Sequence, residues 1–327
     1  MIKIETIKGV DGEVRIMSDL HQWFKDLINY DSGRIYKSPK TRLNELLARK
    51  VNQERQVIDM LLEEFDSILI KSPEELQDFR NLLNGQFPNI FFNRNSQTDF
   101  GKEISWCFNY SYFRNKRLVE YAERLNIKTC PYCNSQYTLN VGTGSSKLGK
   151  FQFDHFFPKE KYPYLSLSMY NLIPVCANCN LSKGSKDYTL QNFFHPYHSS
   201  FNDSSVFQVV LDDEIGLLIE NADQVNINLS NINDPKVAEY KELFKLSEIY
   251  GRHGDIVNNL YLMAKVYTED RINELLNIQD INGEPILIDK ATIYQMILCN
   301  YPKEEDINKR PLAKFTIDIA RQAGLIE

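Results

Sequence analysis

Two Cys-x-x-Cys pairs constrain this chain more than any other feature of its sequence. They are Cys130/Cys133 and Cys176/Cys179, with residues 134–175 between them. Each pair is short enough to turn two sulfur atoms toward one point, and four thiolates suit the tetrahedral geometry of zinc. Because protein would fill all four positions, the spacing predicts a closed, structural Zn²⁺ site. The alternative is two unrelated pairs of buried cysteines.

Length and composition place the chain among soluble globular proteins. It has 327 residues, of which 43% are hydrophobic and 25% charged, so more than one structural unit is expected. No apolar run approaches the roughly 20 residues that span a bilayer, and the first residues lack the features of a signal peptide. We therefore expect a cytoplasmic protein with no membrane association. In a reducing cytosol the cysteine pairs favour metal binding over disulfides.

The charge is unevenly distributed. The whole chain carries a net charge of −6, which is not typical of a nucleic-acid-binding protein. Residues 1–127 are neutral, residues 128–200 hold seven lysines and three acidic residues, and residues 201–327 hold 12 basic and 22 acidic residues. We expect three parts with these boundaries: a helical N-terminal region, a basic central core with the cysteine pairs, and an acidic C-terminal region.

Periodicity predicts a mostly helical α+β fold. Ser38-Pro39 and the capping box Ser72-Pro73-Glu74-Glu75 mark helix starts in the first part, and Gly85 is expected to end the second of these helices. A long helix is expected between them, and its buried side would comprise Ile58, Leu61, Leu62, Phe65 and Ile68. The central part alternates like strands over 136–141 and 150–155. The last part predicts a hairpin over 206–219 that turns at 212–216, followed by helices over 235–249, 253–267, 269–277, 290–299 and 311–323.

A group of polar residues between and just after the cysteine pairs indicates chemistry. Asp154-His155 ends a predicted strand, Asn171 precedes the second pair, and Asn180 and Lys183 follow it. Imidazole titrates near neutral pH, so His155 is the candidate general base, and the carboxylate of Asp154 offers hard oxygen to Mg²⁺ or Mn²⁺. Asn180 is expected at the start of a helix, where its amide oxygen would complete the cation site. Lys183, one helical turn further, could contact a phosphate.

The order Cys-x-x-Cys, Asp-His, Asn-Leu, Cys-x-x-Cys-Asn-x-x-Lys resembles the zinc-knuckle form of the HNH, or ββα-metal, endonucleases. The resemblance covers about residues 128–198, with Asn180 where many members have histidine. It implies a ββα-metal core with a four-cysteine zinc site and a metal-dependent endonuclease that hydrolyses the phosphodiester bonds of nucleic acid. It also implies that Asn171 holds the loop behind the general base by bonding backbone groups. Lys159, Lys161 and Lys186 would add electrostatic affinity.

A second, shorter resemblance lies in residues 243–253. It is similar to the helices that follow the nuclease core in HNH proteins of bacterial anti-phage defence, of the Septu type or associated with retrons. That resemblance implies a separate ATPase of the ABC/RecF-like class as the partner. For the nuclease itself, DNA is the expected substrate. An RNA (tRNA) nuclease of the same fold, or a non-catalytic zinc module that binds nucleic acid or protein, remain the alternatives.

Each of these residues also has a simpler interpretation. A lone Asp-His pair is more often a surface hydrogen bond than a catalytic dyad, and Asn171 and Lys183 can be ordinary turn and surface residues. Cys130-Pro131-Tyr132-Cys133 is also a glutaredoxin dithiol sequence, but a second pair competes for the thiolates. Gly144 to Lys150 resembles a phosphate-binding loop that lacks the required serine or threonine. The aromatic run over 106–113 is expected to pack in a core, with base stacking as the alternative. The resemblance implies that the stretch from His195 to His198 closes the central domain, with a direct catalytic role for either histidine as the alternative.

Overall fold

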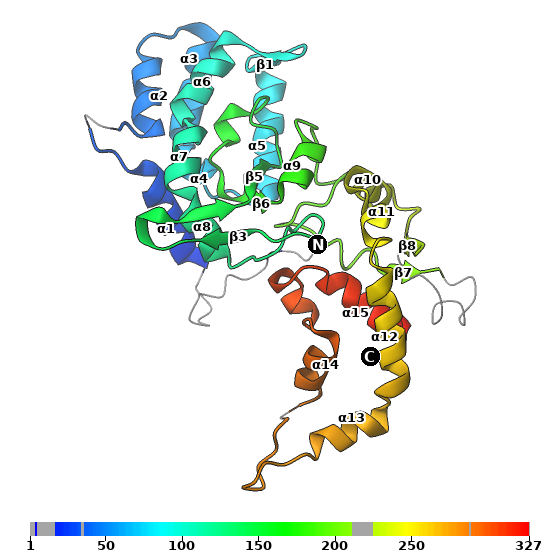
Figure 1. The fold of residues 1–327 in the computed structure, drawn as a ribbon. Coiled ribbons are helices and arrows are strands. Elements are labelled where there is room, and N and C mark those ends of the chain that lie inside the picture. The colour runs from blue at the N-terminus through cyan, green and yellow to red at the C-terminus, as the bar shows by residue number, and fades with distance from the viewer. Residues whose placement is uncertain (1–3, 5–16, 34–35, 211–224, 288, 327) are drawn as a thin grey trace. The chain divides into compact units, whose positions relative to one another are not determined.

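The structure is a computed structural model that describes residues 4, 17–33, 36–210, 225–287 and 289–326 (Figure 1). The chain divides into two compact units, and each is described by itself. One unit comprises Lys3–Ile127 and Thr138–Ser199. The other comprises Met1–Ile2, Lys128–Tyr137 and Ser200–Glu327. About half of the chain is helical and its sheets are small and antiparallel, so the predicted mixed α+β class is confirmed.

Helices form the first part of the larger unit. They are α1 (Met17–Asn29), α2 (Pro39–Leu47), α3 (Asn52–Glu63), α4 (Phe65–Ile68), α5 (Pro73–Gln86), α6 (Asp99–Phe108), α7 (Tyr110–Lys116) and α8 (Leu118–Leu125). A short hairpin of β1 (Phe92–Asn93) and β2 (Ser96–Gln97) precedes α6. The side chain of Ser38 caps α2, and Ser72 and Glu75 form the predicted capping box of α5.

Two predictions for these helices were wrong. The expected long helix breaks at Glu64, which separates α3 from α4. Four of the five residues predicted for its buried side are fully buried, whereas Leu62 is only partly buried. Gly85 does not end α5, because the helix continues to Gln86. A glycine just after a helix favours termination only where the chain adopts a left-handed conformation, and Gly85 does not have a positive φ.

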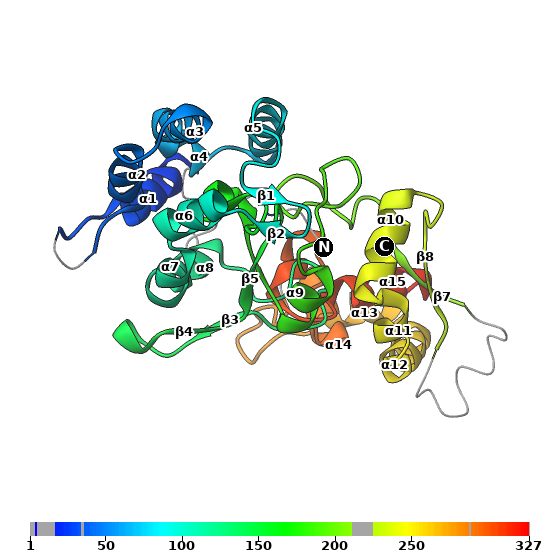
Figure 2. The same ribbon diagram turned by 90° about the horizontal axis from the view of Figure 1, so that it is seen from above.

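A strand–strand–helix segment follows the helices. β5 (Gln152–His155) pairs with β6 (Leu172–Val175) in antiparallel register, with Asp154 opposite Ile173 and His155 opposite Leu172. α9 (Ala177–Lys183) starts two residues after β6 and packs on β5 (Figures 1 and 2). The connection from β5 to β6 contains two short 3₁₀ turns, Pro163–Leu165 and Met169–Asn171.

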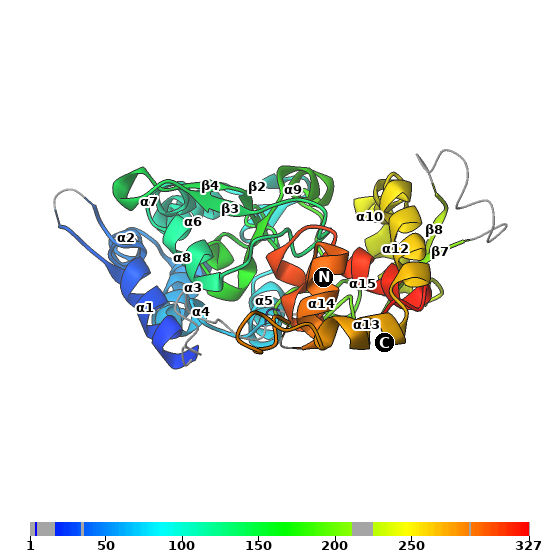
Figure 3. The ribbon, with the colours of Figure 1, turned by 60° about the horizontal axis from the view of Figure 1, so that its bottom comes forward.

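The two expected strands are present but shorter, and they do not pair with each other. β3 (Leu139–Val141) pairs with β4 (Leu148–Lys150) across the turn that contains a 3₁₀ helix at Gly144–Ser146. Both strands lie beside α8, as Figure 3 shows. The glycine-rich segment is therefore a hairpin connection and does not open a helix, which rules out a phosphate-binding loop there.

The second unit combines a strand pair with helices. β7 (Phe207–Val209) pairs with β8 (Ile227–Leu229), so the predicted hairpin has its second strand later than expected. Its expected turn at 212–216 lies outside the described residues. The helices are α10 (Pro235–Phe244), α11 (Leu246–Tyr250), α12 (Gly254–Val266), α13 (Glu269–Leu276), α14 (Lys290–Leu298) and α15 (Ala313–Gln322). α12 and α15 pack side by side (Figure 3).

The helix expected over 235–249 is divided in two. Lys245 has a left-handed φ of 51° and separates α10 from α11. The other four helices of this part lie within one or two residues of their predicted bounds. No helix in the described part of the chain has the length and apolar character needed to cross a membrane.

Candidate functional site

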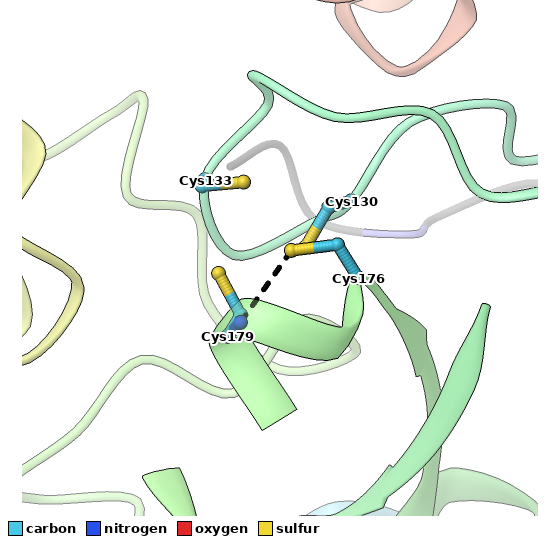
Figure 4. Close-up of side chains that lie close together, drawn as sticks. All are labelled: Cys130, Cys133, Cys176 and Cys179. Atoms are coloured by element: carbon cyan, nitrogen blue, oxygen red, sulfur yellow. Dashed lines mark hydrogen bonds between the residues drawn. The ribbon is translucent and has the colours of Figure 1, made fainter. Parts of the chain in front are cut away.

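The four cysteines of the two pairs lie together. Their sulfur atoms are all within 4.8 Å of one another and all four residues are buried (Figure 4). A tetrahedral zinc ion with Zn–S bonds of about 2.3 Å would place its sulfurs about 3.8 Å apart, so the cluster can hold zinc. Among the described residues this is the only group of three or more His, Cys, Asp or Glu side chains close enough for a metal. Cys107 and Cys299 are not part of it.

Backbone geometry accounts for the turn at each pair. In the first, the amide of Asn134 donates to the carbonyl of Cys130 at 2.8 Å, and Asn134 has a left-handed φ of 54°. In the second, Cys176 is the N-cap of α9, and its sulfur accepts from the amide of Cys179 at 3.5 Å. N–H donors toward sulfur favour the thiolate, which is the form that binds metal.

His155 is held by a backbone carbonyl and an aromatic ring. Its Nε2 lies 3.0 Å from the carbonyl oxygen of Ser166, and its ring meets that of Tyr110 edge to face at 4.5 Å. A carbonyl can only accept, so Nε2 carries the proton and, in the neutral ring, Nδ1 has the lone pair. Burial, with the positive charge of Lys159 as a second cause, lowers the pKa of His155 to about 3. The imidazole is therefore neutral at pH 7, as a general base must be.

Asp154 and Lys183 form a buried ion pair. The ammonium of Lys183 donates to Oδ1 of Asp154 at 3.1 Å and to the carbonyl of His155 at 2.8 Å, and Lys183 has no exposed surface. We expected Lys183 to contact a phosphate, but it does not line the pocket beside His155. Lys183 lies one helical turn after Asn180, as predicted. Its side chain is directed into the protein, where its positive charge pairs with the carboxylate of Asp154.

Replacing Lys183 with methionine is expected to lower the free energy of unfolding by about 3–5 kcal/mol, because it leaves the carboxylate of Asp154 buried without its cation. The double variant Lys183→Met/Asp154→Asn should be more stable than Lys183→Met alone. Urea unfolding of the three chains measures this. If Lys183→Met has wild-type stability but binds nucleic acid more weakly, the result would contradict the structural role and support a phosphate contact by Lys183.

Asn171 bonds the backbone of the loop that follows β5. Its Oδ1 accepts from the amide of Phe157 at 2.8 Å, and its Nδ2 donates to the carbonyls of Phe157 at 3.1 Å and Leu165 at 2.9 Å. The residue is fully buried. These contacts tie the loop immediately behind His155, so Asn171 contacts neither the pocket nor any reacting group.

Asn171→Ala is expected to cost about 2 kcal/mol or more of the free energy of unfolding, because the amide and the carbonyl of Phe157 lose their partner and each unsatisfied group costs about 1–3 kcal/mol. Thermal and urea unfolding measure the loss. Asn178→Ala, at an exposed position on α9, is the control and should stay within about 0.5 kcal/mol of wild type. Equal stability of the two variants would contradict the contacts.

A pocket of about 480 Å³ opens beside His155. Its polar lining comes from β5, the turn after β5, α9 and the residue after Gly184: Gln152, Asp154, His155, Lys159, Glu160, Asn178, Asn180 and Ser185. The Nδ2 of Asn180 donates to Oε1 of Gln152 at 2.6 Å, so the amide oxygen of Asn180 is the atom that can ligate a cation. The structure thus brings Asp154, His155 and Asn180 to one pocket and leaves Asn171 and Lys183 behind it.

The two other histidines of the central part lie elsewhere. His195 is fully buried, its ring centroid lies 4.2 Å from that of Phe156, and its Nδ1 accepts from the amide of Tyr197. Burial is the main cause that lowers the pKa of His195 well below 6.5. His198 contacts the carboxylate of Glu74. Neither histidine lines the pocket.

Acid is expected to destabilise the chain through His195. The folded state keeps this imidazole neutral, whereas the unfolded chain takes up a proton below its ordinary pKa of 6.5. The stabilisation is therefore complete above pH 6.5 and is lost as the pH falls below it. In His195→Gln, the difference in unfolding free energy between pH 7.5 and pH 5.5 should be smaller than in wild type by about 1.4 kcal/mol. Urea unfolding at both values measures it, and an unchanged difference would contradict the neutral state.

Sequence reasoning did not identify four groups around the pocket. Gln152 orients Asn180, Ser166 supplies its backbone carbonyl to His155, Tyr110 supplies an aromatic contact, and Glu160 lines the pocket beside Lys159. Gln152 and Glu160 lie close to the Asp-His pair in the sequence and could have been proposed. A backbone carbonyl leaves no sequence signal, and nothing in the spacing connects Tyr110 with His155.

Comparison of the chain with protein-family models, with curated proteins and with solved structures found no match. The function is therefore argued from the geometry of this site and from the motif.

Proposed function

We propose that this chain is a metal-dependent HNH-type endonuclease that hydrolyses phosphodiester bonds, with DNA as its substrate. One observation carries the proposal: a neutral imidazole, oriented through its Nε2, lies in the same pocket as a carboxylate and an amide oxygen presented by β5 and α9. The order of strand, strand and helix agrees with a ββα-metal core. The cysteine cluster would be its structural zinc site.

The chain's own residues have distinct tasks in this reaction. His155 would take a proton from the attacking water at Nδ1, while Ser166 keeps the ring in place through Nε2. Lys183 holds Asp154, and Gln152 holds Asn180, so that both oxygen donors face the pocket. The water oxygen bonds to phosphorus as the bond to the 3′-oxygen breaks. The leaving oxygen takes a proton from solvent water, which gives a 3′-hydroxyl and a 5′-phosphate product.

Asp154 and Asn180 would hold the divalent cation. Carboxylate and amide oxygens are the donors that Mg²⁺ and Mn²⁺ prefer, and Oδ1 of Asp154 is already occupied by Lys183. The cation would supply charge stabilisation at the phosphate and the leaving oxygen. The donors present therefore fit one hard cation with most of its coordination completed by water and substrate.

The cation role is tested by nicking of supercoiled plasmid over a Mn²⁺ titration. Asn180→Ala should need a higher Mn²⁺ concentration for half-maximal rate than wild type, whereas Asn178→Ala, on the same helix and in the same pocket lining, should not. Parallel cleavage assays with single-stranded RNA and tRNA show whether the chain cleaves DNA or RNA. Cleavage of RNA alone would correct the substrate, and no cleavage of any substrate would leave a non-catalytic zinc module.

We also propose a protein partner for the acidic C-terminal part. Its net charge opposes unassisted binding to nucleic acid, and the segment between α13 and α14 has a fully exposed Ile281 and a 56% exposed Ile286. A regulatory ATPase, as implied by the resemblance to anti-phage defence nucleases, would occupy this part. If adding a candidate ATPase together with ATP does not change the nicking rate, the result would count against this partner.

A further inference from the structure

A second pocket lies directly across one turn of chain from the first. The turn from Pro158 to Tyr162 is closed by the amides of Lys161 and Tyr162, which both donate to the carbonyl of Pro158. Pro158, Lys159 and Glu160 line the pocket of His155, whereas Lys161 and Tyr162 line the second one. The second pocket has a volume of about 360 Å³, which is within the range of small-ligand sites. A bound strand that passes over this turn would meet both pockets.

The second pocket combines cations with an aromatic ring. Phe92 of β1 is partly exposed in its wall, and the ammonium of Lys161 lies 5.9 Å from the centre of that ring. Arg94 and the amides of Asn84 and Asn89 complete its polar lining. An aromatic face stacks a base, and neighbouring cations bind the phosphates on either side of it. This is the combination that nucleotide-binding sites use.

Arg94 has two features that indicate a role for its side chain. It occupies the turn of the β1–β2 hairpin with a left-handed φ of 54°, where glycine or asparagine would be less strained. Within the described residues its guanidinium forms no ion pair, so its charge is available to a ligand. Arg94 thus places a cation in the wall of the pocket, where a bound phosphate can meet it.

The one acidic residue of this pocket does not oppose a phosphate. Asp187 is engaged on both oxygens: Arg80 donates to Oδ1 at 3.1 Å, and the hydroxyl of Tyr162 donates to Oδ2 at 2.7 Å. Arg80 is buried, and its positive charge offsets the negative charge of the Asp187 carboxylate. Lys161, at 3.5 Å from Oδ2, adds a second cation. The net charge of the lining is positive once Arg94 is counted.

We propose that this second pocket binds a nucleotide flanking the scissile phosphate, with its base against Phe92 and its phosphate between Lys161 and Arg94. The proposal rests on the proposed nuclease function, since the scissile phosphate is the one that the pocket of His155 would hold. It assigns the β1–β2 hairpin and the turn over 158–162 to substrate binding, and it makes Phe92 and Arg94 binding residues.

The test is binding by the full chain in a His155→Ala background, measured by fluorescence anisotropy with labelled DNA and RNA oligonucleotides. Phe92→Ala should weaken binding roughly 5- to 100-fold, and Phe92→Trp should restore it. Arg94→Gly suits the turn's φ and should reduce the slope of log affinity against log salt by about 1, whereas Arg94→Lys should not. Arg55→Ala, an exposed arginine on α3, is the control and should leave affinity and slope unchanged. Unfolding midpoints confirm that each variant folds.

The outcomes separate the two proposals. Cleavage by wild type together with unchanged binding by Phe92→Ala and Arg94→Gly would overturn the second pocket and leave the nuclease standing. Weaker binding by both variants without cleavage by wild type would support the pocket and overturn the nuclease. Failure of the His155→Ala chain to bind either oligonucleotide would overturn the nucleotide pocket.

Discussion

His155→Ala is expected to lower the rate of phosphodiester cleavage by at least about 10²- to 10⁴-fold, which is the usual contribution of a positioned general base. The imidazole is neutral, its Nε2 is fixed by the carbonyl of Ser166, and its Nδ1 is the atom that can accept a proton. Alanine removes that acceptor and leaves the cysteine cluster and the ion pair of Asp154 intact. Initial rates of plasmid nicking in Mg²⁺ and Mn²⁺ measure the effect.

Two controls accompany this variant. His198→Ala replaces a histidine outside the pocket and should cleave at a rate near that of wild type. Added imidazole should partly restore cleavage by His155→Ala, because the cavity left by the ring opens to the pocket. Equal rates for wild type and His155→Ala would remove the proposed mechanism, even if cleavage itself were confirmed.

Cys176→Ser is expected to lose zinc and the ordered structure around the second cysteine pair. The four sulfurs lie close enough to hold one zinc ion, and zinc binding contributes directly to folding, by about 10–16 kcal/mol in zinc-finger peptides. Cys176 also caps α9, which carries Asn180, so the pocket should be lost with it. Zinc analysis should change from about one ion per chain to well below one, and limited proteolysis should cut near α9.

Cys299→Ser is the matched control for the cysteine cluster. Cys299 is exposed and lies outside the cluster, so this variant should keep its zinc and its resistance to proteolysis. A Cys176→Ser chain that remains folded and fully loaded with zinc would contradict the ligand set. Disulfide reductase activity in a zinc-free wild-type chain would instead support the glutaredoxin-like alternative.

Local sequence signals predicted the parts of the fold that depend on neighbouring residues. The capping box at Ser72 and Glu75 reports a helix start because its hydrogen bonds span only three residues. The two Cys-x-x-Cys pairs predicted a single cluster because each pair turns two sulfurs toward one point and four thiolates suit one zinc ion. The alternating pattern ending at Asp154-His155 predicted β5 for the same reason, since strand periodicity is local.

Features set by distant contacts could not be predicted. The direction of the Lys183 side chain depends on how closely α9 packs on β5, which the spacing along the helix does not determine. The pairing of β3 with β4, and of β5 with β6, depends on chain reversals that the sequence pattern left open. The aromatic run over 106–113 fills a core only in part: Phe108 and Phe113 are buried, whereas Trp106 is 56% exposed and Tyr110 contacts His155.

The most direct test of the central claim is cleavage of supercoiled plasmid by the zinc-loaded wild-type chain, with and without added Mg²⁺ or Mn²⁺. We expect nicked product bearing 5′-phosphate and 3′-hydroxyl ends only when the divalent cation is present. Absence of cleavage of plasmid, RNA and tRNA at any concentration of these cations would contradict the assignment of the His155 pocket as a nuclease site.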